Sequence, residues 1–160
     1  MNSNSAIIGI TLDSWAIMAW LQGEPPGIFV RDLINWCDGK PEAKETITPL
    51  LQEVGGPPKL YLNIVNMGEV FYLVGRKKGE KVALQTVNQI KLMSIEIISA
   101  TDDLVLKAAA IKMKHPIAYA DAFAIATAKN KKSFLMTGDP EIKDTNEVEV
   151  LWIGLNSNLP

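Results

Sequence analysis

Apolar residues follow two patterns that alternate along the chain. Short continuous apolar runs are typical of strands buried on both faces of a sheet, whereas apolar residues at spacings of three and four are typical of helices that pack on it. Because runs and helical stretches take turns, the pattern predicts a parallel sheet with crossover helices on both faces. We therefore expect an α/β fold with three layers, α/β/α.

Five segments carry the strand pattern, and residues that favour turns or helix starts flank them. The first, AIIGITL, is almost entirely apolar, and the last, EVEVLWI, alternates. The predicted strands are residues 6–12, 59–62, 94–99, 133–136 and 147–153.

The stretches between these strands carry helical spacing and helix-capping residues. Asn63 and Thr101 have side chains that cap helix N-termini, and Gly75 or Gly79 is placed to end the helix that follows Asn63. The predicted helices are residues 15–21, 27–38, 41–53, 64–75 or to 79, 80–92, 102–114 and 118–129.

The length of the chain bounds its organisation. At 160 residues it is long enough for one domain with a full core, and neither an internal repeat nor a linker divides it. The sequence thus predicts a single domain over residues 1–160, in which residues 39–58 are a candidate helical insertion.

Charge and cysteine content narrow the class of protein. The 16 basic and 18 acidic side chains leave a net charge of −2, so any nucleic-acid binding must be local. The single cysteine, Cys37, cannot form an intrachain disulfide, which fits a reducing compartment. The N-terminus has no basic region before its apolar run, and Asp13 interrupts that run, so we expect neither signal peptide nor membrane anchor. These features predict a cytoplasmic protein.

Four acidic residues occupy positions that a parallel sheet brings together. Asp13 directly follows a predicted strand and Asp139 lies in the turn after another, and functional groups collect beyond the carboxyl ends of such strands. Glu69 and Asp121 lie early in helices that start from the same edge, each among apolar neighbours. The pattern predicts that all four carboxylates face one site.

Clustered carboxylates repel one another, so they either take up protons or bind a cation. Oxygen ligands without histidine or thiolate favour Mg²⁺ or Mn²⁺. Such a metal polarises a phosphate and lowers the pKa of its water, which is the minimal machinery for phosphodiester hydrolysis.

Each acid also has a simpler interpretation. Asp13 is placed to be a helix N-cap, and Asp139 in TGDP is a common turn residue. Glu69 and Asp121 fit solvated positions on amphipathic helices. Singly, none of the four establishes a site.

Polar and basic residues beside the acids are further candidates. Asn66 lies three residues before Glu69, so its amide is placed to orient that carboxylate, to touch substrate, or to act as a local cap. The run Arg76, Lys77 and Lys78 is a candidate phosphate contact, or a solvated helix end. The tryptophans are expected in the core or an interface: Trp15, Trp20, Trp36 and Trp152.

Together with their neighbours, the acidic segments resemble the PIN-domain family, specifically its VapC-type toxin ribonucleases. The segments are ITLDS, NMGEVFYLV, YADAFAIATA and LMTGDPEI, and the resemblance covers nearly the whole chain. It implies a parallel, five-stranded PIN-like sheet and RNA cleavage with Mg²⁺ or Mn²⁺. By this resemblance the catalytic, metal-binding acids are Asp13, Glu69, Asp121 and Asp139, and Ser14 and Thr137 are small polar residues whose hydroxyls bond a carboxylate or a water.

The resemblance also implies partners: an RNA substrate, a small antitoxin protein and a second copy of the chain in a homodimer. Residues 39–58 lengthen the gap between Asp13 and Glu69 beyond that of compact toxins, and the sequence suggests an added helix over the site.

A second hypothesis is a catalytically silent or receiver-like regulatory module on a similar fold. Receiver-like chemistry needs an acidic pair near the first strand and a lysine after the last one. ITLDS offers one acid and WIGLNSNLP offers no lysine, while a silent variant would have lost one of the four acids. The sequence therefore favours the nuclease.

Overall fold

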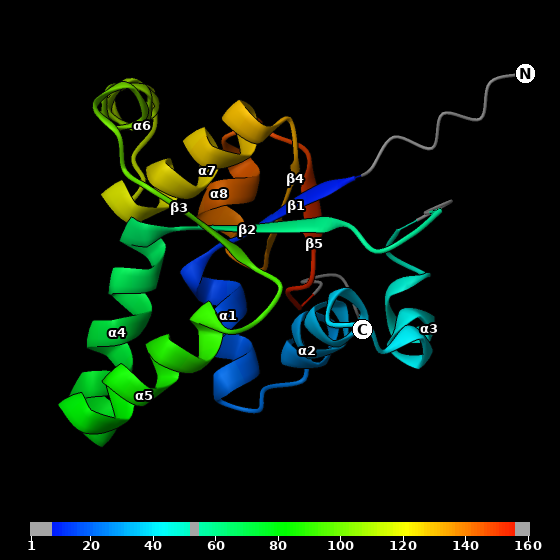
Figure 1. Cartoon of the computed structure of the whole chain (residues 1–160). Coiled ribbons are helices and arrows are strands. Elements are labelled where there is room, and N and C mark those ends of the chain that lie inside the picture. Colours follow the sequence, from blue (N-terminus) through cyan, green and yellow to red (C-terminus); the bar gives the residue numbers. More distant parts are fainter. Residues whose placement is uncertain (1–7, 52–54, 156–160) are drawn as a thin grey trace, which may run out of the picture.

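A five-stranded sheet runs through the middle of the fold (Figure 1). The computed structural model of the chain describes residues 8–51 and 55–155. All four strand pairings are parallel, in the order β3-β2-β1-β4-β5, which confirms the predicted fold class. The strands are β1 (Gly9–Leu12), β2 (Lys59–Asn63), β3 (Glu96–Ile98), β4 (Phe134–Thr137) and β5 (Val150–Trp152).

Helices cover both faces of this sheet. In Figure 1, α1, α2, α4 and α5 lie below it, and α6 and α7 lie above it. The helices are α1 (Ser14–Leu21), α2 (Gly27–Cys37), the 3₁₀ helix η1 (Pro41–Ala43), α3 (Lys44–Ile47), α4 (Ile64–Lys78), α5 (Glu80–Lys91), α6 (Asp102–Lys114), α7 (Tyr119–Lys131) and α8 (Pro140–Asp144).

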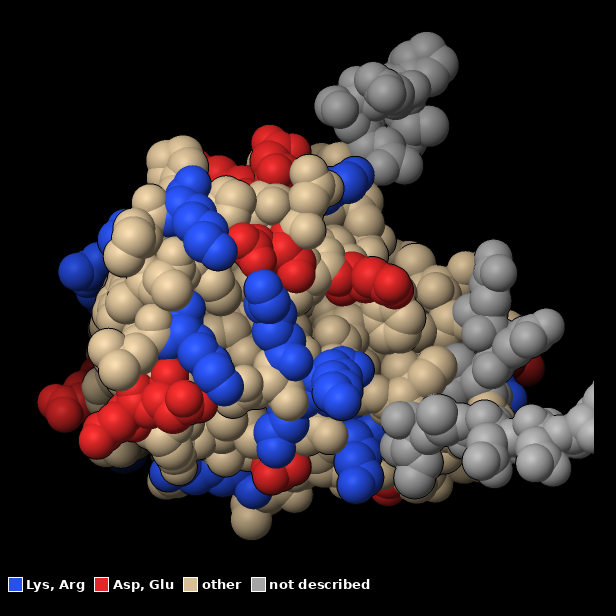
Figure 2. Space-filling view, turned by 90° about the horizontal axis from the view of Figure 1, so that it is seen from above, with Lys and Arg blue, Asp and Glu red and all other residues tan. Residues whose placement is uncertain are grey.

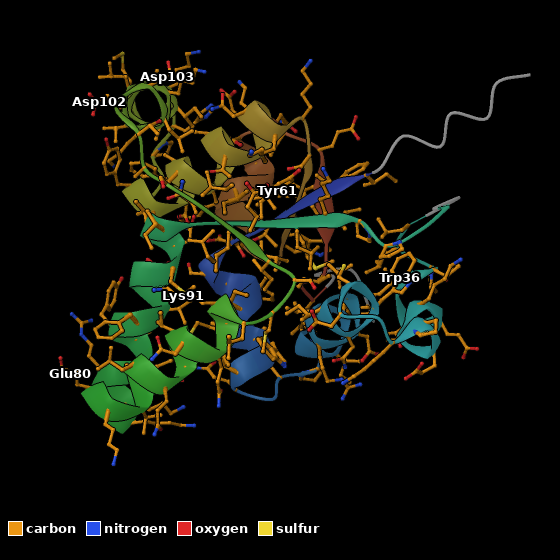
Figure 3. The ribbon with its side chains drawn as sticks, in the orientation of Figure 1. Trp36, Tyr61, Glu80, Lys91, Asp102 and Asp103 are labelled. Atoms are coloured by element: carbon orange, nitrogen blue, oxygen red, sulfur yellow. The ribbon has the colours of Figure 1, made fainter. Side chains whose placement is uncertain are left out.

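The two faces of the sheet carry separate hydrophobic cores, because successive strand residues point to opposite faces. Leu60 and Leu62 of β2 pack with α1, α2 and α4 on the lower face. Tyr61, between them, lies on the other side of β2 (Figure 3). Across that upper face, α7 packs against α6 and Leu135 of β4. The central strands therefore lie between two layers of helices, with one core on each face of the sheet.

The capping residues act as the sequence indicates. The Asn63 side chain accepts a hydrogen bond from the backbone N–H of Val65 at 2.8 Å, and that of Thr101 accepts one from Leu104 at 3.2 Å. Gly79, with φ of 91°, ends α4. This backbone conformation suits glycine because it has no Cβ.

Several predicted boundaries are wrong. The helix predicted over residues 41–53 is replaced by η1 and α3, which ends at Ile47, because Pro49 has no N–H to continue it. The last strand is shorter than residues 147–153, and the turn predicted at TGDP leads into the unpredicted helix α8. Residues 6, 7, 52 and 53 of the predicted elements lie outside the described residues.

Charged side chains of both signs share the face that α6 and α7 cover (Figure 2). Lys107 pairs with Asp103 at 2.8 Å, and Lys129 pairs with Glu147 at 2.7 Å. Figure 2 shows several Lys and Arg side chains close together near the middle of this face, with Asp and Glu side chains beside them. Across residues 8–51 and 55–155, no helix combines the length and the apolar character that crossing a membrane requires.

Candidate metal centre

The predicted acids all lie near one edge of the sheet. Asp13 follows β1 and Asp139 follows β4, and these two strands are paired neighbours in the sheet. Glu69 lies in the second turn of α4 and Asp121 in the first turn of α7, and these two helices pack together. The topology therefore collects residues from both ends of the chain at the carboxyl ends of the central strands.

Three carboxylates form a tight cluster at this edge. One oxygen each of Asp121, Asp139 and Glu141 lies within 4.8 Å of the others. All three, with Glu69, line a cleft of about 680 Å³ between α1, α4, α7 and α8. The other lining residues are Ser14, Trp15, Met18, Ala19, Gln22, Glu24, Tyr72, Leu73, Lys77 and Ala118.

Asp13 lies deeper than the cluster and is 1% exposed. Its Oδ1 accepts from the backbone N–H of Ala16 at 2.8 Å, so it is also the N-cap of α1, and its Oδ2 accepts from the hydroxyl of Thr137. Burial raises the pKa of Asp13 to about 7, against the lowering effect of these two hydrogen bonds. The charges of Asp121 and Asp139 contribute to this raised pKa, so Asp13 belongs electrostatically to the cluster although it is not among the described side chains that line the cleft.

Repulsion from three neighbouring acids contributes to the pKa of Asp121. Its pKa is raised to about 6, first by burial and then by repulsion from Asp139, Glu69 and Glu141. Carboxylates held this close repel one another when they are ionised. A hard divalent cation fits them, because its charge offsets the repulsion that protonation otherwise relieves. The carboxylates present are therefore suitable ligands for such a cation.

Hydroxyl groups hold two of the acids. Ser14 donates to Oε1 of Glu69, and Tyr72 donates to its Oε2 at 3.2 Å. Thr137 donates to Asp13 and accepts from the backbone N–H of Asp139 at 3.0 Å, so one side chain joins the two strand-end acids. Ser14 and Thr137 thus each bond a carboxylate with their hydroxyl groups.

Asn66 holds two helices together. It is completely buried, and its Nδ2 donates to the carbonyl oxygen of Ala120 at 3.0 Å, while its Oδ1 has no partner among the described residues. The hydrogen bond goes to the residue before Asp121 instead of to Glu69. Asn66 therefore fixes the start of α7 against α4, and so the relative position of two acids.

The three basic residues at the end of α4 take different places. Lys77 lines both the cleft and a smaller neighbouring pocket, and Lys78 borders only the smaller pocket, beside Val82. The guanidinium of Arg76 lies over the ring of Tyr72, 4.9 Å from its centroid. Of this predicted run, Lys77 is the residue that the structure places on the acidic cleft.

Sequence comparison places the chain in a family. The model of the PIN domain matches residues 10–148, which include all of the acids above. The chain belongs to the PIN domain family. No curated protein sequence matches it.

Solved structures share the architecture of this PIN domain. VapC20 of Mycobacterium tuberculosis, described as a sarcin-ricin loop cleaving toxin, is 20% identical with a TM-score of 0.61, over 88% of this chain and 98% of that one. DNA-bound VapBC of Salmonella typhimurium is 11% identical with a TM-score of 0.61, over 89% and 96%. FitAcB of Neisseria gonorrhoeae is 20% identical with a TM-score of 0.57, over 88% and 95%. At these identities the likeness establishes the shared fold.

Several residues that line the cleft of this PIN domain were not assigned to the site from the sequence, among them Glu141, Tyr72 and Trp15. Glu141 had a usable signal, since Asp139-Pro140 is a cap followed by a favoured first helical residue, which places Glu141 in a first turn beside Asp139. Trp15, expected in the core or an interface, lines the cleft as well as packing against the core.

The lengthened segment of the PIN domain lies away from the cleft. Helices η1 and α3 pack against α2, and Thr46 donates to the carboxylate of Asp32 at 2.6 Å. Within residues 39–51 and 55–58, the described part of the segment, no side chain lines the cleft. The expected helix over the site is therefore not found there.

Gly138 positions the TGDP motif of the PIN domain against α1. A Cβ atom at this residue would lie 2.5 Å from Cζ2 of Trp15, well inside van der Waals contact. Only glycine lets the chain pass this close to the indole ring before it reaches Asp139.

Replacing Gly138 with alanine is expected to lower the free energy of unfolding by about 1–3 kcal/mol, because the added methyl group overpacks the Trp15 contact. Urea denaturation followed by circular dichroism measures this. Gly68→Ala is the control: Gly68 lies inside α4 with open space around it, so alanine there should stabilise the protein by about 0.5–1 kcal/mol. Equal stability of Gly138→Ala and wild type would contradict the packing argument.

Proposed function

We propose that this PIN domain is a metal-dependent endoribonuclease, the toxin component of a toxin–antitoxin pair. The observation that carries the proposal is the carboxylate cluster of Asp121, Asp139 and Glu141 with Glu69 on one open cleft. The PIN domain family consists of nucleases, so the reaction that we propose for the cluster is hydrolysis of a phosphodiester bond. RNA as substrate and the toxin role rest on the sequence resemblance and on the VapC-type neighbours.

The proposed ligands are carboxylates only, which favours Mg²⁺ or Mn²⁺. Asp121, Asp139 and Glu69 are placed to hold the metal from the cleft walls, and Asp13 supports it from below with its negative charge. When bound, the metal polarises the scissile phosphate and lowers the pKa of its water. Glu141, which sequence reasoning did not assign, joins this set because its carboxylate lies with those of Asp121 and Asp139.

The remaining polar residues keep the acids in place. Ser14 and Tyr72 each donate to one oxygen of Glu69, which restricts the rotation of its carboxylate. Thr137 does the same for Asp13. Lys77, which lines the same cleft as Asp121, supplies a positive charge for the RNA backbone. Preorganised groups of this kind act without reorganisation at the moment of reaction.

The proposal extends to partners and location. Solved neighbours include a toxin–antitoxin complex from Klebsiella pneumoniae and VapBC2 from Rickettsia felis, which supports an antitoxin protein as the partner of this chain. By the same resemblance we propose a homodimer, and the single cysteine and the N-terminal sequence support a cytoplasmic location.

The test is cleavage by the purified protein of a mixture of structured and unstructured RNAs, with Mg²⁺ or Mn²⁺ and with EDTA. We expect internal cuts with metal, none in EDTA, and none in single-stranded DNA of the same sequence. No cleavage of any RNA across millimolar metal, by protein shown to be folded, would refute the proposal.

A further inference from the structure

The cleft has a wall that the carboxylate chemistry does not use. Apolar and aromatic side chains from α1 and α4 line it beside the acids: Trp15, Met18, Tyr72 and Leu73. An apolar wall next to a phosphate-cutting site suits the flat face of a nucleobase, because stacking on an aromatic ring removes apolar surface from water.

Tyr72 is the exposed aromatic residue nearest to the acids. Its side chain is 44% exposed, and its hydroxyl donates to Oε2 of Glu69 at 3.2 Å. Tyr72 is therefore joined by one hydrogen bond to Glu69, a proposed metal ligand. A base on this ring would belong to a nucleotide that adjoins the scissile phosphate.

Two basic residues complete the same face of α4. The guanidinium of Arg76 lies 4.9 Å from the centroid of the Tyr72 ring, and Lys77 lines the cleft. Glu69, Tyr72 and Arg76 follow one another at spacings of three and four, so they share one side of the helix. An acid, a ring and a positive charge thus stand in sequence along one helical face.

The contacts of Tyr72 hold its ring in place before substrate arrives. The hydroxyl is tied to Glu69, and the cation of Arg76 covers part of the ring, so both ends of the side chain are restrained. A restrained ring loses little conformational freedom when a base stacks on it. Both features favour a binding surface over a solvated tyrosine.

We propose that Tyr72 is a substrate-binding residue whose ring stacks the nucleobase next to the scissile phosphate. The inference rests on the proposed function, because it needs RNA as the substrate. It goes further by assigning a recognition role to a residue outside the acidic cluster. The contact requires the base to be unpaired where it meets the ring, since a paired base stacks within its own duplex.

The experiment measures binding without cleavage, in an Asp121→Asn background with Mg²⁺ present. The probes are a fluorescein-labelled oligoadenylate of about ten nucleotides and an abasic ribose-phosphate oligomer of the same length. Tyr72→Leu removes the ring, and Tyr72→Phe keeps the ring but removes the hydrogen bond to Glu69. Tyr119→Leu is the matched control, because Tyr119 is 41% exposed on α7 and is not among the described residues that line the cleft.

Tyr72→Leu is expected to weaken oligoadenylate binding by about tenfold, the usual scale of a base-stacking contact, and to leave binding of the abasic oligomer unchanged. Tyr72→Phe should lose less oligoadenylate affinity than Tyr72→Leu, because the ring remains and only the hydrogen bond that restrains it is lost. Tyr119→Leu should bind both probes like the parent. An unchanged oligoadenylate affinity in Tyr72→Leu, or an equal loss for both probes, would overturn the stacking role while leaving the nuclease intact. Binding of neither probe by the parent protein would overturn the proposed function, and this inference with it.

Discussion

Asp121→Asn is expected to lower RNA cleavage by about 100-fold or more and, at the same time, to raise the melting temperature of the metal-free protein. The first effect follows because a proposed metal ligand loses its charge, and a loss of about 3 kcal/mol in transition-state stabilisation corresponds to about 100-fold in rate. The second follows because the substitution removes a half-buried charge that Asp139, Glu69 and Glu141 repel. For a domain of this size, relief of about 1–2 kcal/mol corresponds to about 5 °C.

Initial rates with saturating Mg²⁺ and thermal melting in EDTA measure the two effects on the same preparation. Asp103→Asn is the matched control, since Asp103 is exposed on α6 and pairs with Lys107 at 2.8 Å, so both readouts should stay close to wild type. A variant that is both inactive and less stable in EDTA would indicate damage to the fold and contradict the repulsion argument. Undiminished cleavage would remove Asp121 from the proposed site.

The melting temperature of the metal-free protein is expected to fall as the pH rises from about 5 to about 7.5. Folding raises the pKa of Asp13 to about 7 and that of Asp121 to about 6, above their ordinary value of 3.8. Between these values the folded protein keeps protons that the unfolded chain has lost, so the stabilisation is complete below about pH 4 and is lost as the pH rises through 6 and 7. A loss of about 3 kcal/mol would lower the melting temperature by about 10 °C.

Mg²⁺ or Mn²⁺ should reverse this trend, because a cation binds the ionised carboxylates and stabilises the folded state by mass action. Melting curves across the pH range, with EDTA and with millimolar metal, measure both effects. Asp121→Asn lacks one of the two titrating carboxyls and should show a shallower fall in EDTA. A metal-free melting temperature that rises between pH 5 and 7.5 would contradict the raised pKa values.

The sequence predicted the layers of the fold and the acidic edge of the sheet because both depend on local patterns. Apolar runs mark the central strands, and Asp13 and Asp139 follow β1 and β4, which topology places side by side. Asn63 and Thr101 could be recognised as caps because the signal lies within three residues. Periodicity and capping therefore sufficed for the fold class and for the acidic edge.

What the sequence did not predict depends on contacts between distant residues. Asn66 lies one turn before Glu69, yet its amide reaches Ala120, and nothing in the local sequence shows that partner. Arg76, Lys77 and Lys78 are adjacent in sequence but point to different surroundings around the end of α4. The early end of α3 is different, since Pro49 was visible in the sequence and outweighs the apolar spacing around it.

The hydrogen bond from Thr137 to Asp13 joins residues 124 positions apart. It connects the residue that follows β1 to the last residue of β4. During synthesis, Asp13, Glu69 and Asp121 emerge from the ribosome before the strand and helix that carry Thr137, Asp139 and Glu141. A nascent chain that ends before β4 lacks Asp139 and Glu141, two of the three carboxylates of the cluster, so the complete set of acids assembles only after β4 and α8 have been made. For a protein that cuts RNA, this order of assembly delays activity until β4 and α8 have left the ribosome that made them.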